Sequence, residues 1–176
     1  MSDASADPIL RFYRHEAPDA RGRLLRDVWS WRDDQLEAVH DYIQWLFPLP
    51  EPSAFNPAAP LLRAATIDAF QTDTGLQHAL QTSLERMLAF YRLAASDAPI
   101  RIDPSPAFRI ETPHWLRPGD HNHLRLTRSI RSLRLLGLPA HARALRTCLE
   151  SIAADHPGAI APATLSYWRS ASEGGL

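Results

Sequence analysis

Two Glu-x-x-His pairs are the residues of this sequence whose spacing most resembles a metal-binding motif. They are Glu37 with His40 and Glu111 with His114. In four-helix di-iron sites, Glu and His three residues apart share one helix face and bind a metal together. The first pair lies in a predicted helix, but the second includes Pro113 within a proline-rich connection, and no further inward-facing glutamates accompany them. We therefore interpret both pairs as surface residues and predict no metal and no other cofactor.

The contiguous triplet His121-Asn122-His123 is a second arrangement that could bind a metal. On a helix the two imidazoles would project about 200° apart, which prevents both from reaching one ion. We expect the triplet to form the N-terminus of a helix. An enzyme or a metal-dependent protein that uses His and carboxylate residues remains an alternative, with these candidate side chains: Glu37, His40, His114 and His121.

No catalytic set is predicted. The sole cysteine, Cys148, lies on the apolar face of a predicted helix with no His and carboxylate beside it in the sequence, so we expect an inert core thiol. The sequence contains no Gly-rich phosphate loop and no nucleophile elbow. These observations make a noncatalytic protein the preferred interpretation, although they leave enzyme activity undecided.

Arginines are concentrated between residues 117 and 149. This stretch holds seven arginines and one acid, Asp120, for a local charge of 7 − 1 = +6, whereas residues 27–51 hold six acids and Arg32, for 1 − 6 = −5. Because the formal net charge is only −1, we expect the two segments to neutralise each other. Nucleic-acid binding through the arginine-rich helix is the disfavoured alternative.

Composition predicts a cytoplasmic protein. The first residues carry acids where a secretory signal carries bases, and no stretch approaches the roughly 20 apolar residues that a spanning helix requires. We therefore predict no membrane association.

All basic residues are arginine, which together with many Ala and Leu residues indicates a bacterial genome. The oligomeric state is left open.

Hydrophobic periodicity predicts an all-α fold: a single compact domain over residues 1–176, with about six to eight helices and long Pro-rich connections. One helix is expected from Asp33 to Phe47, ended by Pro48, and residues 94–120 are expected to be irregular. Gly137 and Pro139 should separate two later helices. The remaining predicted helices occupy residues 8–14, 23–29, 66–70, 73–91, 120–136, 139–156 and 163–171.

One segment, His40-Asp-Tyr-Ile-Gln-Trp-Leu-Phe-Pro-Leu49, resembles the signature of the opioid growth factor receptor conserved domain. Further blocks of similarity are Asn56 to Leu61, Met87 to Tyr91 and Asn122 to Arg128, so that the resemblance is strongest over residues 24–154. It implies a helical, noncatalytic domain whose vertebrate relatives are receptors for the pentapeptide Met-enkephalin.

The resemblance and the lack of a catalytic set together suggest a binding module for a peptide or protein segment. We expect the signature helix and the arginine-rich helix to lie side by side, with Asp41 paired to Arg125 or Arg128 and with Trp45 and Trp168 as aromatic walls. The candidate ligand-binding residues are His40, Asp41, Gln44, Trp45, Asn122, Arg125, Arg128 and Trp168.

Overall fold

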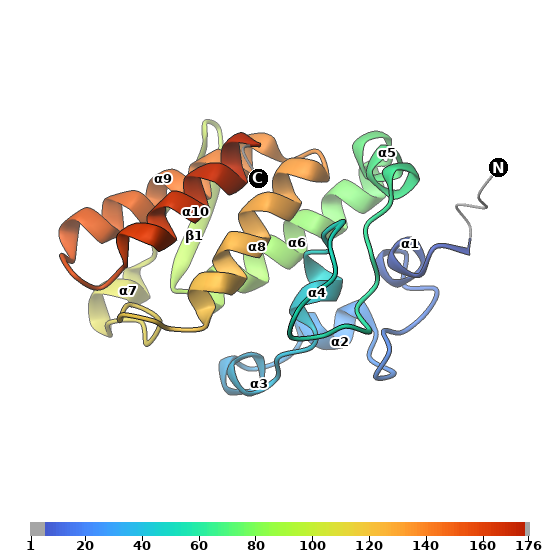
Figure 1. The fold of residues 1–176 in the computed structure, drawn as a ribbon, viewed down its shortest axis with the longest axis horizontal. Coiled ribbons are helices and arrows are strands. Elements are labelled where there is room, and N and C mark those ends of the chain that lie inside the picture. The colour runs from blue at the N-terminus through green and yellow to red at the C-terminus, as the bar shows by residue number, and fades with distance from the viewer. Residues whose placement is uncertain (1–5, 175–176) are drawn as a thin grey trace. The chain divides into compact units, whose positions relative to one another are not determined.

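The computed structural model describes residues 6–174, which contain ten α-helices and one two-stranded antiparallel sheet. The chain divides into two compact units, the first up to Arg86 and the second from Met87 onward. Figure 1 shows the order of the elements along the chain. Each unit is described by itself, and the expectation of one domain over the whole chain stays a prediction.

The first unit consists mainly of short helices. These are α1 (Pro8–Tyr13), α2 (Leu25–Trp29), α3 (Asp33–Ala38), α4 (Ile43–Leu46), α5 (Ala64–Thr72) and most of α6 (Thr74–Phe90). Helices of four to six residues are marginal by themselves and depend on tertiary packing. Asp7 illustrates how they are tied together: one carboxylate oxygen caps α1 at the backbone N–H of Ile9 (2.8 Å), and the other accepts a bond from the Thr66 hydroxyl of α5 (2.7 Å).

The single helix expected from Asp33 to Phe47 is wrong, because the chain leaves the helix after Ala38 and forms α4 separately. Val39 has an extended backbone (φ −96°, ψ 135°). The Tyr42 hydroxyl donates to the backbone carbonyl of Leu36 at 3.1 Å. Long-range contacts of this kind overcome the helical preference of the intervening residues, which periodicity alone does not reveal.

Aromatic side chains fill the core of the first unit. The Phe12 ring lies 5.3 Å from the Trp45 ring, and Tyr13 packs edge-to-face on Phe70 at 4.8 Å between centroids. The buried Tyr13 hydroxyl donates to the backbone carbonyl of Leu46. These contacts join α1, α4 and α5, so residues far apart in the sequence form one apolar cluster.

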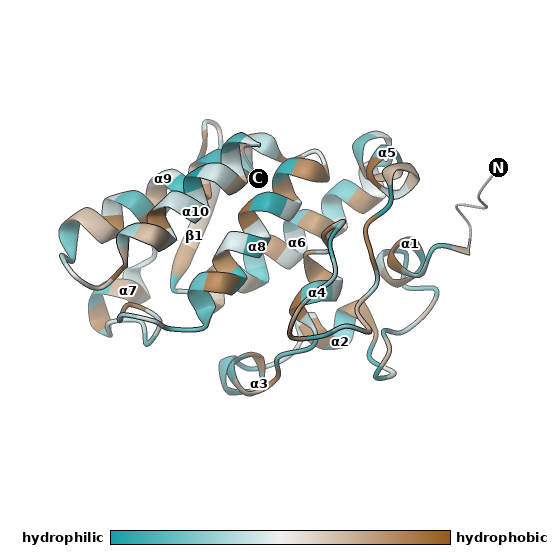
Figure 2. Cartoon of the chain, in the orientation of Figure 1, coloured by the Kyte–Doolittle hydropathy of each residue, from teal (hydrophilic) through white to brown (hydrophobic). Residues whose placement is uncertain are grey.

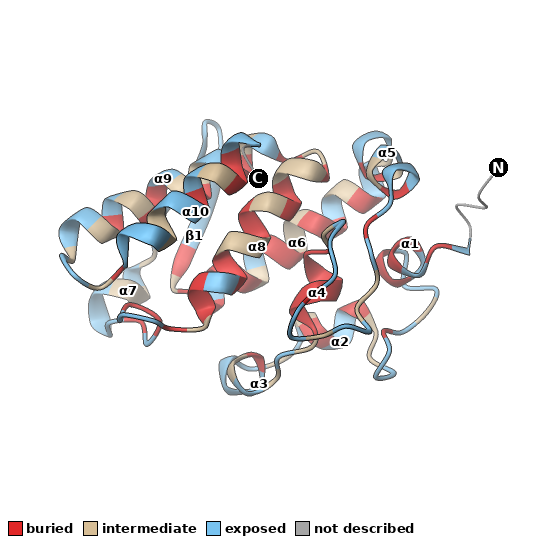
Figure 3. Ribbon diagram, viewed as in Figure 1, coloured by how far each residue is buried: buried red, intermediate tan, exposed pale blue. Residues whose placement is uncertain are grey.

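The second unit combines a β-hairpin with four helices. Its elements are β1 (Leu93–Asp97), β2 (Ile100–Pro104), α7 (Pro106–Ile110), α8 (Asn122–Leu135), α9 (Pro139–Asp155) and α10 (Pro162–Glu173). The last three helices pack on one another, and β2 packs against α9. Figure 2 shows hydrophobic and hydrophilic residues along each of these helices, and Figure 3 shows that α8 is buried along much of its length.

The hairpin corrects the expectation of an all-α fold and of an irregular segment over residues 94–120. β1 and β2 pair in register from Leu93 opposite Pro104 to Asp97 opposite Ile100. The later helices agree better with the prediction: Gly137 has a positive φ of 94° just after α8, and Pro139 begins α9. The final helix is longer than the predicted residues 163–171.

None of the helices formed by residues 6–174 is long and apolar enough to cross a membrane.

Candidate functional site

The signature segment of the first unit is mainly buried. Every residue from Tyr42 to Pro48 is buried, and Trp45 is only 6% exposed. His40, at the start of the segment, is exposed. The amide side chain of Gln44 is buried as well. Trp45 is thus a core residue of this segment, which is not one continuous helix.

Asp41 lies in an ion-pair network of the first unit. Its carboxylate accepts hydrogen bonds from Arg21 Nε (2.9 Å) and Arg23 Nη1 (2.8 Å). Arg23 also binds Asp19 at 2.6 Å and lies over the Trp31 ring, 5.4 Å from its centroid. Burial opposes ionisation, but the bonds and charges of Arg23 and Arg21 hold the pKa of Asp41 below its ordinary value. Neither arginine was foreseen from the sequence.

A buried polar network surrounds the N-terminus of α8 in the second unit. Asn122 is fully buried; its amide nitrogen lies 3.0 Å from Asp120 Oδ1 and 3.3 Å from His114 Nε2, and its Oδ1 accepts a bond from Arg125 Nη1 at 3.1 Å. Arg117 donates to the other Asp120 oxygen at 2.9 Å. Burial alone would raise the pKa of Asp120. The hydrogen bonds from the Asn122 backbone, Arg117 and the Asn122 side chain outweigh burial, so the pKa lies below its ordinary value.

His123 is held between two tryptophans of the same unit. Its Nε2 lies 2.9 Å from the Trp115 carbonyl oxygen, and its ring meets the Trp115 and Trp168 rings edge-on. Trp168 is fully buried and donates from its indole nitrogen to the His123 carbonyl at 3.3 Å. The indole therefore joins α10 to the start of α8, and a role of Trp168 as a ligand wall would require it to become accessible.

The eight candidate residues fall into two groups of four. His40, Asp41, Gln44 and Trp45 belong to the first unit, and the other four belong to the second. Within the second, Asn122 is bonded to Arg125, Arg128 is half-buried on α8, and Trp168 contacts neighbouring His123. A single site formed by both groups stays a prediction.

The arginine-rich stretch does not form one exposed basic face. Of its seven arginines only Arg117 and Arg143 are classed as exposed, and Arg125 is 5% exposed. Arg134 of α8 donates to the Ala171 carbonyl of α10 at 3.0 Å, and Arg146 of α9 pairs with Glu173 of α10 at 3.6 Å. These arginines connect α8, α9 and α10, which does not favour their use as a continuous phosphate-binding surface.

The two Glu-x-x-His pairs have different local structures. Glu37 is on α3 and His40 follows the end of that helix, whereas Glu111 is the C-cap of α7 and binds Arg92 at 2.8 Å. His114 lies in the connection beyond α7. Within residues 6–174, no three His, Cys, Asp or Glu side chains are grouped so that they could hold one metal ion.

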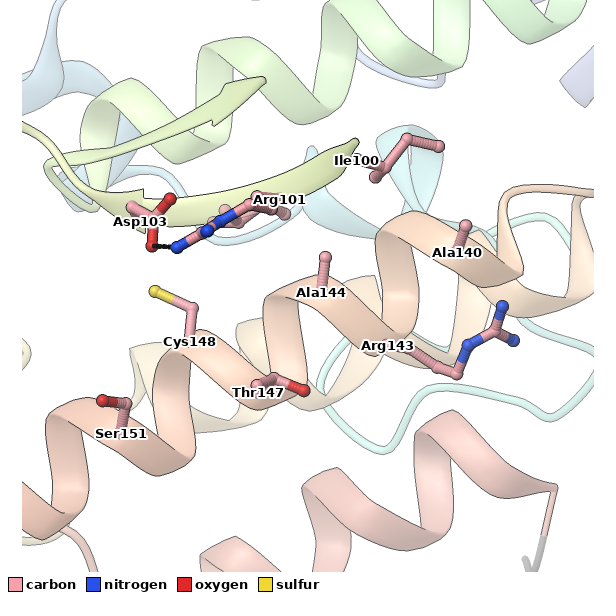
Figure 4. A pocket seen from close by; sticks show the side chains of 10 residues that line it. Ile100, Arg101, Asp103, Ala140, Arg143, Ala144, Thr147, Cys148 and Ser151 are labelled. Atoms are coloured by element: carbon pink, nitrogen blue, oxygen red, sulfur yellow. Dashed lines mark hydrogen bonds and ion pairs between the residues drawn. The ribbon is translucent and has the colours of Figure 1, made fainter. Parts of the chain in front are cut away.

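A groove between β2 and α9 is a concave feature of the second unit that sequence reasoning missed. Its volume is about 530 Å³, within the usual range of roughly 300–1,000 Å³ for ligand sites. Figure 4 shows β2 on one side and α9 on the other. The lining residues are Ile100, Arg101, Ile102, Asp103, Ala140, Arg143, Ala144, Thr147, Cys148 and Ser151.

Cys148 is buried at the α9 side of this groove, as its position on the apolar face predicted. It is 6% exposed. Burial, and secondarily the negative charge of Asp103, raise the pKa of the thiol to about 12. The thiol is therefore protonated near neutral pH, so it provides polarisable surface and not a nucleophile.

A smaller cavity of about 330 Å³ lies in the first unit, beside the start of α6. Its lining includes Tyr13, His15, Trp29 and Thr82. The half-buried Trp29 indole donates to Ser83 at 3.0 Å and meets the His15 ring edge-on. Because its aromatic lining is already engaged in internal contacts, this cavity is a suitable comparison site for experiments on the groove.

The comparisons with known proteins assign the chain to one family. The profile described as the opioid growth factor receptor (OGFr) conserved region matches residues 4–172. The chain belongs to the family that this region defines. No solved structure matches the chain.

Two kinds of curated relative are similar to the chain. The opioid growth factor receptor of Mus musculus is 36% identical over 157 residues, covering 84% of this chain and 24% of that protein. The Homo sapiens receptor is 35% identical over 144 residues, covering 77% and 21%. Opioid growth factor receptor-like protein 1 of Xenopus tropicalis is 33% identical over 132 residues, covering 73% and 25%. The chain thus spans about a quarter of the length of these relatives.

Proposed function

We propose that this protein is a noncatalytic module that binds a peptide or protein segment in the groove between β2 and α9. One observation carries the proposal: a groove of about 530 Å³ lies beside a strand that has a neighbouring strand on one side only. Strand edges and helix-lined grooves are recurring sites of peptide recognition. Relatives named as receptors support a binding role for the family region.

The chemistry of the groove favours recognition over catalysis. Its cysteine is protonated, since the thiol pKa is raised to about 12. Its other polar groups are two hydroxyls, two guanidinium groups and one carboxylate. Ile100 and Ile102 supply apolar contacts from the strand, while Ala140 and Ala144 leave room above the helix. Such a surface can bind the side chains and backbone of a peptide, and its lining does not pair a nucleophile with a general base.

Selection from a displayed peptide library, with the full chain as target, tests the proposal. The variant Ala144→Trp fills the groove from α9, and Thr82→Trp fills the cavity of the first unit as a matched control. We expect selected peptides to lose at least tenfold in affinity on Ala144→Trp and less than twofold on Thr82→Trp. Failure to select any peptide, or selection of peptides insensitive to Ala144→Trp, would contradict the proposed function.

A further inference from the structure

The outer edge of β2 is the feature of the groove that narrows the class of ligand. The sheet has two strands, and β1 occupies one side of β2. Within the described part of the chain, residues 100–104 make no backbone hydrogen bond outside the hairpin. A strand with a single neighbour directs about half of its backbone N–H and C=O groups away from that neighbour. The edge of β2 can therefore pair with another extended chain.

The side of α9 that lines the groove carries mainly short side chains. Helical positions 140, 144, 147, 148 and 151 carry only Ala, Thr, Cys and Ser side chains. Figure 4 shows these short side chains along α9 below the strand. An added strand needs about 4.8 Å from β2, and the five residues of β2 would span about 17 Å of it. A segment that paired with the whole of β2 would contribute about five residues.

The charges of the groove indicate which side chains that segment carries. The lining of the groove contains two guanidinium groups, those of Arg101 and Arg143, and one carboxylate, that of Asp103, which gives a local charge of 2 − 1 = +1. Arg143 is exposed and makes no ion pair within the described residues. Arg101 lies 3.4 Å from Asp103, but both side chains are more than half exposed, so that pair is weak. A negatively charged partner is favoured over a positively charged one.

We propose that the groove binds an acidic segment in extended conformation, paired as an added strand to β2. This inference rests on the proposed function and specifies its ligand. Backbone hydrogen bonds to the β2 edge provide affinity that does not depend on sequence, and acidic side chains near Arg101 and Arg143 provide selectivity. Alternate apolar side chains of the segment would contact Ile100, which is 37% exposed, and the small residues of α9.

Fluorescence anisotropy with synthetic octapeptides tests this inference. The probe is a dye-labelled peptide of alternating Val and Glu, compared with alternating Val and Lys and with the acidic peptide N-methylated at four consecutive central residues. We expect the acidic peptide to bind at least tenfold more tightly than the basic one, and N-methylation to abolish binding. Arg143→Glu should weaken binding at least tenfold, whereas Arg109→Glu, outside the groove, should change it less than twofold.

The outcomes separate the two proposals. If the basic or the N-methylated peptide binds as tightly as the acidic peptide, the proposal of an acidic added strand is overturned, while the proposal of peptide binding in the groove stands. The same conclusion follows if the library peptides bind in the groove, as shown by their sensitivity to Ala144→Trp, but are neither acidic nor dependent on their backbone N–H groups. If neither octapeptides nor library peptides bind, both proposals fail.

Discussion

Replacing Asn122 with Ala should destabilise the second unit substantially. The substitution removes the amide that links Asp120, His114 and Arg125 at distances of 3.0, 3.3 and 3.1 Å. Two of these partners are charged, and bonds to charged groups contribute about 1.5–3 kcal/mol each, with a further cost when a buried group loses a partner. Although Asn122 is fully buried, Asp120 keeps its bonds from the residue-122 backbone N–H and from Arg117. We therefore expect a loss at the lower end of this range, about 3 kcal/mol overall.

Thermal unfolding followed by circular dichroism measures this effect. For a protein of this length about 1 kcal/mol shifts Tm by 2–4 °C, so Asn122→Ala should lower Tm by about 6–12 °C. Leu124→Ala is the matched control on the same helix, because Leu124 is 56% exposed and its truncation should cost under about 0.5 kcal/mol. Equal melting of the two variants would refute the stabilising role of the network. Weakened peptide binding with unchanged melting would assign Asn122 to a ligand site.

Three other buried polar groups have measurable effects on stability or reactivity. Because the pKa of Asp120 is lowered in the folded state, the ionised carboxylate stabilises the fold above its ordinary pKa of 3.8, and this stabilisation is lost as pH falls through the lower folded pKa. The Asp120→Asn variant should therefore lose less stability than the parent between about pH 4 and pH 2. Equal losses in urea titrations at a series of pH values would contradict this. Cys148, with a pKa of about 12, should react with iodoacetamide at pH 8 far more slowly than in urea, and Asp103→Asn should accelerate the reaction only modestly because burial is the larger cause; rapid native alkylation would contradict the assignment. Tyr13→Phe should cost about 1–3 kcal/mol in chemical denaturation, because the buried Leu46 carbonyl loses its donor, and an unchanged midpoint would show that this bond is dispensable.

Local sequence signals accounted for the long helices. α6, α8 and α9 carry apolar residues at helical spacing. α8 ends just before Gly137 and α9 begins at Pro139, two residues whose backbone preferences act locally. The break between α3 and α4 was not predictable in this way. It accompanies the bond of Tyr42 to Leu36 and the ion pairs of Asp41 with Arg21 and Arg23, which depend on tertiary structure.

The hairpin left a signal that was overlooked. Ile100 and Ile102 alternate with Arg101 and Asp103 directly after Ala98-Pro99, a period-two pattern after a turn. The prolines around it were interpreted as marks of an irregular connection. Missing β2 also meant missing the groove, because the small residues of α9 acquire a ligand-sized space only once a strand lies opposite them.

The buried polar residues near α8 were singled out for a different reason. Asn122, Arg125 and Trp168 are candidate ligand contacts because the signature helix and the arginine-rich helix are expected to lie side by side, with tryptophans as aromatic walls. In the structure, bonds within the second unit engage them: Asn122 with Asp120, Arg125 with Asn122, and Trp168 with His123. Residue type and spacing indicate that such residues make specific contacts. Their burial in the structure is needed to distinguish contacts within the fold from contacts with a ligand.

Hydrogen–deuterium exchange, measured with and without a library-selected peptide, tests the central claim most directly. If the peptide binds in the groove as an added strand, amide exchange should slow in residues 100–104 of β2 and in residues 140–151 of α9. Exchange in residues 13–29 and 73–82, which include the lining of the first-unit cavity, should stay unchanged. Protection confined to those first-unit residues, with none in β2, would contradict the account.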